Sequence, residues 1–280
     1  MKKISKPEIS QQDVCNTFKE LKYRERVLEK TEEYDEIHLQ VSDLLSDEKY
    51  FILHDANYKS YMKKIYSERF SNKNYKNSYI YYREIRDSED KCPYCSYITR
   101  QVSQLDHYLP KSIFPSLAIT INNLVPICSE CNSNKDNYYS INENETLLHP
   151  YYDKALDEVF NFLKCRVIED SNIGFEFYIE NLSHWDPILY NRVNKHFKLL
   201  KIDYLYCADF NADFVSCFEE LKSLYEENED IEEICTILER KVKSLFKTKI
   251  KPWAYAGFRS ILESNWFLEI YLPDKISRIN

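Results

Sequence analysis

The segment from Cys92 to Lys135 reads CPYCSYITRQVSQLDHYLPKSIFPSLAITINNLVPICSECNSNK, and it decides the fold of this part of the chain. It contains two identical knuckles, Cys92-x2-Cys95 and Cys128-x2-Cys131, which are separated by 32 residues. Each knuckle brings two thiolates within reach of one ion, and structural Zn²⁺ prefers four such ligands in a tetrahedron. The long loop between the knuckles adds little closure entropy and leaves room for a functional insert. The pattern therefore predicts a structural zinc site that uses all four cysteines.

Three other interpretations of these cysteines were weighed. Cys92-Pro93-Tyr94-Cys95 matches a glutaredoxin-type redox motif, but that motif needs a preceding strand, and a polar stretch, Asp87 to Lys91, stands there instead. A cytidine-deaminase zinc site needs H-x-E upstream of its cysteines, and the sequence contains no H-x-E. Four ordinary buried cysteines would not explain the repeated spacing.

The composition indicates a globular, mainly helical protein of 280 residues. Apolar residues make up 44%, which suffices for a hydrophobic core, and only 2 residues are glycine, which favours helices over a turn-rich β sandwich. No stretch approaches the roughly 18 apolar residues that span a bilayer. The basic segment from Met1 to Ser10 lacks the apolar run of a signal peptide. We therefore expect a cytoplasmic protein whose nine cysteines serve as metal ligands and buried thiols rather than disulfides.

The charge is unevenly distributed, although the formal net charge is −8. Lys49–Arg86 holds nine Lys and Arg against three acids, and Arg240–Arg259 holds seven and no acid. Glu219–Glu233 holds eight acids and one Lys. Basic stretches bind phosphates locally even on an acidic protein, and a solvated helix face is the equally weighted alternative.

The insert between the knuckles carries LDHYLPK at 105–111 and ends with NNLVPICSECNSNK at 122–135. Phosphodiester hydrolysis needs an activated water and charge stabilisation at the phosphate. His107 accepts a proton near neutral pH, and Asp106 offers a hard oxygen ligand for Mg²⁺ or Mn²⁺. In a regular strand these adjacent side chains would point to opposite faces. Asn132 supplies a neutral amide oxygen as a second ligand.

In order, the motifs are a cysteine knuckle, Asp-His followed by Pro and Lys, Asn-Leu, a second knuckle, then Asn and Lys. This set resembles the HNH (ββα-metal) endonuclease family in its four-cysteine zinc variant, over roughly a sixth of the chain. The resemblance implies that Asp106 and Asn132 hold a catalytic Mg²⁺ or Mn²⁺ and that His107 is the general base. In the family a distorted loop after the strand lets Asp106 and His107 serve one site.

The same resemblance assigns further roles. Asn123 would complete the catalytic set by tying down the loop that bears His107. Lys111 and Lys135 are candidates for phosphate contact, and Lys135 is favoured because it lies one helical turn from Asn132. Many family members have His at the position of Asn132, and an amide suits Mg²⁺ or Mn²⁺ better than imidazole does.

We expect an α+β, mainly helical fold in which helical regions flank a small ββα-metal nuclease core. Its regions would be an N-terminal helical part at 1–88, the HNH core with structural zinc at 89–150, and a β-hairpin plus C-terminal helical part at 151–280. The hairpin strands are predicted at 162–168 and 173–179. Helices are predicted at 55–70, 75–85, 129–137, 187–200, 204–227, 231–246 and 252–267. Asp186 followed by Pro187 is a cap and first-turn signal for the helix at 187–200. His149 is interpreted as structural packing rather than a substrate contact.

These features together predict a divalent-metal-dependent endonuclease acting on DNA, and the resemblance implies 5′-phosphate and 3′-hydroxyl products. The flanking helical parts resemble HNH proteins encoded beside an ATPase in bacterial antiphage systems such as Septu, which implies a partner ATPase. No membrane is expected among the partners, because the sequence has no apolar stretch long enough to span one. Two alternatives stay open. One is an RNase that uses the same site. The other is a zinc module that binds nucleic acid or protein without cleavage, which the set of Asp106, His107 and Asn132 disfavours.

Overall fold

The computed structural model describes residues 1–40, 56–96, 100–170, 172–228 and 230–277. The chain divides into two compact units, which are taken separately below. One unit comprises Met1–Asp157 together with Asp186–Leu200, and the other comprises Glu158–Trp185 together with Lys201–Asn280. The division into three regions at 1–88, 89–150 and 151–280 stays a prediction.

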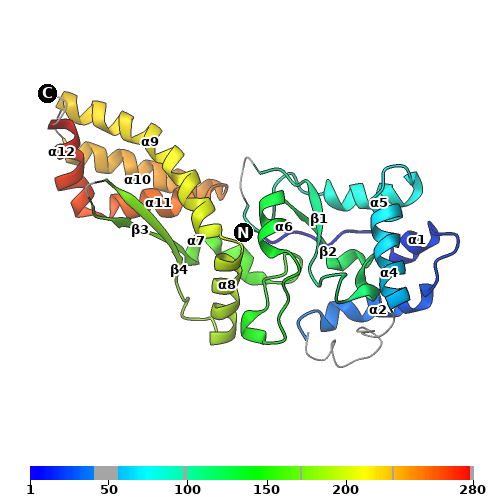
Figure 1. The fold of residues 1–280 in the computed structure, drawn as a ribbon. Helices are drawn as coiled ribbons and strands as arrows, with labels where there is room; N and C mark the ends of the chain where they lie inside the picture. The colour runs from blue at the N-terminus through cyan, green and yellow to red at the C-terminus, as the bar shows by residue number, and fades with distance from the viewer. Residues whose placement is uncertain (41–55, 97–99, 171, 229, 278–280) are drawn as a thin grey trace. The chain divides into compact units, whose positions relative to one another are not determined.

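The first unit contains a small ββα arrangement (Figure 1). Strands β1 (Gln104–His107) and β2 (Leu124–Ile127) pair antiparallel. Helix α6 (Ser129–Lys135) follows β2 directly, in place of the helix predicted at 129–137. Cys128 is the N-cap of α6, and its sulfur accepts a hydrogen bond from the backbone N–H of Cys131 at 3.5 Å. The second knuckle therefore both begins the helix and contributes two thiols.

The N-terminal helices pack against this hairpin, and in the view of Figure 1 they lie on the side opposite α6. They are α1 (Gln11–Asn16), α2 (Arg24–Ile37), α4 (Ala56–Lys64), the π-helical η1 (Ile65–Phe70) and α5 (Lys76–Arg86). The segment predicted as one helix at 55–70 thus forms α4 and η1, and its first residue falls outside the described residues. The buried core that joins these helices to the hairpin includes Val14, Met62, Phe70, Ile85 and Leu124.

The loop between β1 and β2 is itself a buried element. It contains two short 3-10 turns, η2 (Pro115–Leu117) and η3 (Ile121–Asn123), and every residue from 114 to 121 is buried. Buried backbone N–H and C=O groups need hydrogen-bond partners. Side chains from elsewhere in the unit supply several of these partners: Gln11 bonds the carbonyl oxygen of Ile119 and the N–H of Ile121, and His107 bonds the carbonyl oxygen of Ala118.

Helix α8 (Pro187–Leu199) also belongs to the first unit, close to the short turn η4 (Glu143–Glu145). The carboxylate of Asp186 accepts a hydrogen bond from the backbone N–H of Leu189 at 2.7 Å and caps the helix, as predicted. Arg192, on the buried face of α8, forms a two-pronged ion pair of 2.9 and 2.8 Å with Asp153. The 3-10 turn η5 (Lys154–Glu158) follows this aspartate.

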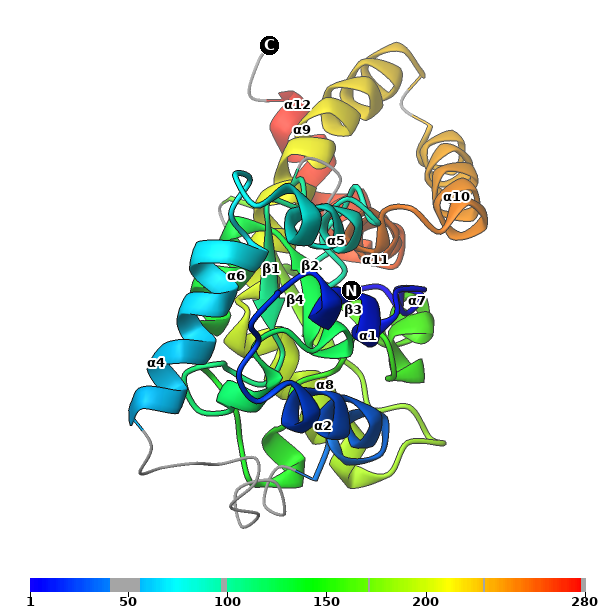
Figure 2. The same cartoon turned by 90° about the vertical axis from the view of Figure 1, so that its right-hand side faces the viewer.

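The second unit carries the predicted hairpin, with β3 (Leu163–Ile168) antiparallel to β4 (Gly174–Ile179). Its helical elements are α7 (Val159–Phe162), α9 (Ile202–Asn228), α10 (Ile231–Thr248), α11 (Pro252–Leu262), η6 (Phe267–Tyr271) and α12 (Leu272–Ser277). Helix α9 packs on β4, α11 packs on β3, and α10 adjoins α11 (Figures 1 and 2). A Cβ on Gly257 would lie 2.4 Å from the Phe210 ring, so the glycine permits the close approach of α9 and α11.

The helix predicted at 252–267 ends earlier, at Leu262. The hydroxyl of Ser264 accepts a hydrogen bond from the backbone N–H of Phe267 at 3.1 Å, which starts a new helical segment. The fold is nevertheless α+β and mainly helical, as predicted, and the described residues form two small sheets. No helix among the described residues has the length and apolar character needed to cross a membrane.

Candidate functional site

Four buried cysteine sulfurs converge beside the hairpin. The Sγ atoms of Cys92, Cys95, Cys128 and Cys131 all lie within 4.8 Å of one another, and those of Cys95 and Cys128 are 3.9 Å apart. Tetrahedral zinc with Zn–S bonds of about 2.3 Å separates its sulfur ligands by about 3.8 Å. Burial raises the pKa of the Cys92 thiol well above its usual value, so four uncompensated thiolates would be unstable here without a cation. The cluster therefore fits one structural metal ion, and its donor set suits zinc.

His107, at the end of β1, has a defined protonation state. Its side chain is buried, and Nε2 lies 2.9 Å from the carbonyl oxygen of Ala118. A carbonyl only accepts, so Nε2 carries the hydrogen and the lone pair of Nδ1 is available. Burial lowers the pKa of His107 well below its usual value, and the positive charge of Lys111 adds to this. Tyr66 packs edge-on against the ring with centroids 4.4 Å apart, so the imidazole is held neutral and oriented.

Asp106 is also buried, and both of its carboxylate oxygens have donors. Lys135 lies 3.0 Å from Oδ1, and the hydroxyl of Tyr94 donates to Oδ2 at 3.0 Å. The ammonium group of Lys135 also donates to the carbonyl oxygen of His107 at 2.9 Å. Lys135 was expected to contact phosphate, but its side chain is fully buried in this structure and forms an ion pair with Asp106.

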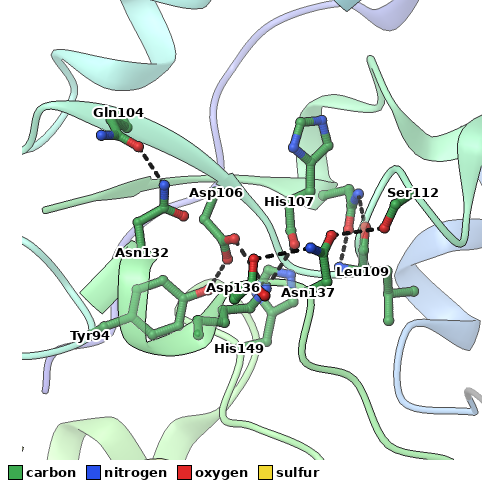
Figure 3. A network of polar contacts seen from close by, with 12 residues as sticks. Tyr94, Gln104, Asp106, His107, Leu109, Ser112, Asn132, Asp136, Asn137 and His149 are labelled. Carbon is green, nitrogen blue, oxygen red and sulfur yellow. Dashed lines mark hydrogen bonds and ion pairs between the residues drawn. The ribbon is translucent and has the colours of Figure 1, made fainter. Parts of the chain in front are cut away.

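Asn132 presents a partly free amide on the first turn of α6. Its Nδ2 donates to Oε1 of Gln104, a residue of β1 (Figure 3). Its Oδ1 accepts no hydrogen bond from any residue that the structure describes. A carboxylate and an amide oxygen are hard donors, which is the chemistry that Mg²⁺ and Mn²⁺ prefer. The donors at Asp106 and Asn132 thus fit such an ion in kind, and Oδ1 of Asp106 would have to exchange the ammonium group for it.

The positive charge of Lys111 acts on both Asp106 and His107. Burial lowers its pKa, the Asp106 carboxylate opposes that effect, and the charges of Lys63 and Lys135 reinforce it. Its Nζ lies 4.8 Å above the ring of Tyr66, the same ring that packs on His107. Lys111 is only half-buried, so it is the lysine of the predicted pair that stays accessible to a phosphate.

Asn123 makes the contacts expected of a residue that fixes the loop after β1. Its Oδ1 accepts from the backbone N–H of Leu109 at 2.8 Å and from the Tyr34 hydroxyl at 2.9 Å. Its Nδ2 donates to the carbonyl oxygens of Leu109 and Leu117 at 3.0 and 3.2 Å. One buried amide therefore holds two separate points of the loop, and its role in catalysis stays a prediction.

His149 extends this network. Its Nδ1 accepts from the backbone N–H of Tyr151 at 3.2 Å, and its Nε2 lies 3.3 Å from the Tyr34 hydroxyl oxygen. Because that hydroxyl already donates to Asn123, its oxygen accepts the Nε2–H of His149. The ring is fully buried, and burial lowers its pKa well below the usual value. These contacts agree with a packing role.

The adjacent side chains of β1 point apart. In Figure 3 the imidazole of His107 and the carboxylate of Asp106 extend to opposite sides of the strand, while Asn132 lies on the side of Asp106. The distorted loop expected from the family is not seen, because both residues lie inside the regular β1–β2 pairing, where side chains alternate. The charge of Lys111 acts on both groups, and a single site that contains His107 and Asp106 stays a prediction.

Two residues of the site were missed by the sequence analysis. Tyr94 stands between the cysteines of the first knuckle, where only the thiols attracted notice, and its hydroxyl reaches Asp106. Tyr66 lies in the helix predicted at 55–70, where it was given no role, and its ring contacts His107. Neither contact has a local signal, because each joins segments distant in sequence.

Residues 92–138 match the family model described as HNH endonuclease. The chain therefore carries an HNH endonuclease domain in which β1, β2 and α6 form the ββα unit and the four cysteines cluster behind it. A nucleic acid is the substrate that such a domain implies.

Two curated proteins are similar to parts of the chain. Protein ea31 of Escherichia phage lambda is 31% identical over 143 residues, which is 50% of this chain and 48% of that protein. Septu protein PtuB of Bacillus thuringiensis is 27% identical over 118 residues, 41% of this chain and 45% of that protein. The chain thus aligns with about half the length of each relative. No solved structure gives a significant match.

Proposed function

We propose that the chain is a divalent-metal-dependent endonuclease that hydrolyses DNA phosphodiester bonds. The observation that carries the proposal is the neutral imidazole of His107, inside the segment that matches the HNH family. With Nε2–H donated to Ala118, the lone pair on Nδ1 is the base that removes a proton from an attacking water.

The remaining site residues would bind the metal and the phosphate and keep His107 in its orientation. Asp106 and Asn132 would hold Mg²⁺ or Mn²⁺, which when bound stabilises negative charge on the phosphate and on the leaving oxygen. Lys111 would contact a non-bridging phosphate oxygen. Asn123 keeps the loop after β1 in place, so that His107 keeps its orientation. Zinc at the four cysteines would fix the start of α6, and with it Asn132, relative to the strands.

The similarity to Septu protein PtuB supports a biological setting for this activity. We propose that the chain is the nuclease component of a bacterial antiphage system and that a partner ATPase controls it. The buried ion pair between Lys135 and Asp106 agrees with a site that needs activation. Adding the partner would then raise the cleavage rate, whereas full cutting by the isolated chain would count against this control.

An assay across substrates tests the proposed chemistry. Labelled DNA and RNA of matched sequence are incubated with the full chain in Mg²⁺, in Mn²⁺ and in EDTA. We expect cleavage of DNA with either ion and none in EDTA, with a phosphate left on the 5′ end. Preferential cleavage of RNA would favour the RNase alternative. The non-catalytic module would be favoured if the chain bound the DNA or the RNA in a zinc-dependent way but cleaved neither, with or without the partner ATPase.

A further inference from the structure

The first unit contains a cavity of about 480 Å³ lined by basic and neutral side chains. The end of α1, the end of η1 and the start of α5 form its walls. Polar groups that line it include Thr17, Lys19, Arg69, Asn74, Lys76 and Asn77. No lining residue is acidic, so the charged side chains of the lining are all positive, which favours an anion.

The three basic side chains of this cavity can pair with an anionic ligand. Among the residues that the structure describes, Lys19, Arg69 and Lys76 form no ion pair with a carboxylate, and all three are exposed. The guanidinium group of Arg69 lies 5.8 Å from the centroid of the Tyr75 ring, which orients it. The first turn of α5 has no acidic residue, and its N-cap, Tyr75, makes no side-chain cap.

The helical segment η1 connects this cavity to the catalytic residues. Arg69 lies three residues after Tyr66, whose ring packs on His107 with centroids 4.4 Å apart. On the preceding helix, α4, Lys63 is near enough to Lys111 for the two charges to repel. From residue 56 to residue 86 the chain carries eight Lys and Arg against two acids. The segment that contributes Tyr66 to the site and Arg69, Tyr75 and Lys76 to the cavity is therefore strongly basic.

We propose that this cavity binds the phosphodiester backbone of the DNA substrate, on the strand that is cut at His107. The inference rests on the proposed nuclease function. A polyanion with regularly spaced phosphates fits several cations spread over η1 and α5 better than one small anion does. Amide and hydroxyl side chains donate to phosphate oxygens without reading the base sequence. The cavity thus supplies affinity and register rather than sequence specificity.

A binding experiment on a full chain that does not cut isolates this role. His107→Ala is combined with Lys19→Gln and Lys76→Gln, and binding to a labelled DNA duplex is followed by fluorescence anisotropy at several salt concentrations. The matched control combines His107→Ala with Lys154→Gln and Lys222→Gln, which removes the same charge. Lys154 is exposed and lies outside the cavity, and Lys222 lies in the acidic stretch Glu219–Glu233.

We expect the cavity pair to weaken DNA binding about tenfold and to reduce the slope of log affinity against log salt by about 2, because two phosphate contacts are lost. The control pair should change neither. The proposal would be overturned if both pairs lost DNA affinity equally or if the cavity pair lost none. It would also be overturned if the His107→Ala parent bound no DNA, or if only RNA binding depended on the cavity. Cleavage by the same pairs with His107 intact separates the two claims. If DNA binding depends on the cavity but the protein with His107 intact cuts nothing, only the proposed nuclease activity is refuted. If the cavity pair with His107 intact cuts DNA as efficiently as wild type, only the proposed role of the cavity is refuted.

Discussion

The ammonium group of Lys135 lies 3.0 Å from Oδ1 of Asp106, and both side chains are buried. A cation thus already occupies the carboxylate that we assign to Mg²⁺ or Mn²⁺. Two cations at one oxygen repel each other strongly at low dielectric, so binding of the divalent ion requires this pair to open. If Asp106 holds the metal as proposed, the lysine stabilises the metal-free fold and would compete with the metal.

Lys135→Met should therefore have two opposite effects. Without divalent metal it leaves the buried carboxylate of Asp106 unpaired, which should lower the free energy of unfolding by about 3–5 kcal/mol. With the competitor removed, the affinity for Mn²⁺ should rise. Denaturant unfolding in buffer with neither EDTA nor added divalent metal measures the free energy of unfolding. Calorimetric titration with Mn²⁺ measures the affinity for the metal.

Lys154→Met is the control for this prediction, since Lys154 is exposed. It should change neither quantity. Unchanged or weaker Mn²⁺ binding by a folded Lys135→Met protein would show that the lysine does not compete with a metal at Asp106.

Loss of one knuckle thiol should release the structural metal. Cys95→Ser removes a ligand from the four-sulfur cluster, and we expect the zinc content of the purified protein to fall from one ion per chain to a small fraction, with loss of the folded core. Cys207→Ser, at a half-buried cysteine outside the cluster, should retain zinc. Elemental analysis distinguishes the two, and equal zinc in both variants would remove the structural ion from the account.

The neighbouring asparagines Asn122 and Asn123 should differ in their contribution to stability. Asn123→Ala removes four buried hydrogen bonds and leaves the Leu109 N–H and the Tyr34 hydroxyl hydrogen without their acceptor, which should cost about 3 kcal/mol or more. Asn122→Ala loses one exposed hydrogen bond to Asp35 and should cost about 1 kcal/mol or less. Unfolding in urea measures both, and similar losses would contradict the loop-fixing role.

The sequence predicted well what local pattern controls. The spacing of the knuckles fixed which four sulfurs meet, and Asp186-Pro187 marked the start of α8. It predicted poorly what depends on distant contacts. A lysine one turn after Asn132 looks like any exposed helical charge, and its burial against Asp106 arises only when α6 packs on β1. The alternation of Asp106 and His107 was predicted by strand geometry and set aside in favour of the family pattern, yet the structure keeps it.

Acid should destabilise the fold through its buried imidazoles. Burial lowers the pKa of His149 well below its usual value and that of His196 to about 3. Above the unfolded-state pKa of about 6.5 both states are neutral, and below it only the unfolded chain takes up protons. Stability should therefore fall with pH below this value, by about 1.4 kcal/mol per unit for each such histidine.

His149→Gln isolates one contribution to this slope. Urea unfolding near neutral pH and about one unit below the usual histidine pKa should show a smaller pH dependence for the variant, by the contribution of one proton. An unchanged slope would mean that His149 is protonated equally in the folded and unfolded states, against its buried network with Tyr34 and Tyr151.

The most direct test of the central claim is nicking of supercoiled plasmid DNA in Mn²⁺ by the full chain, with any required partner present, compared between wild type, His107→Ala and His184→Ala. His184 is a control because its side chain is 61% exposed and lies outside the site. We expect wild-type nicking by His184→Ala and at least a hundredfold loss for His107→Ala, because a general base usually contributes about 10²–10⁴. Wild-type nicking by a folded, zinc-loaded His107→Ala protein would contradict it.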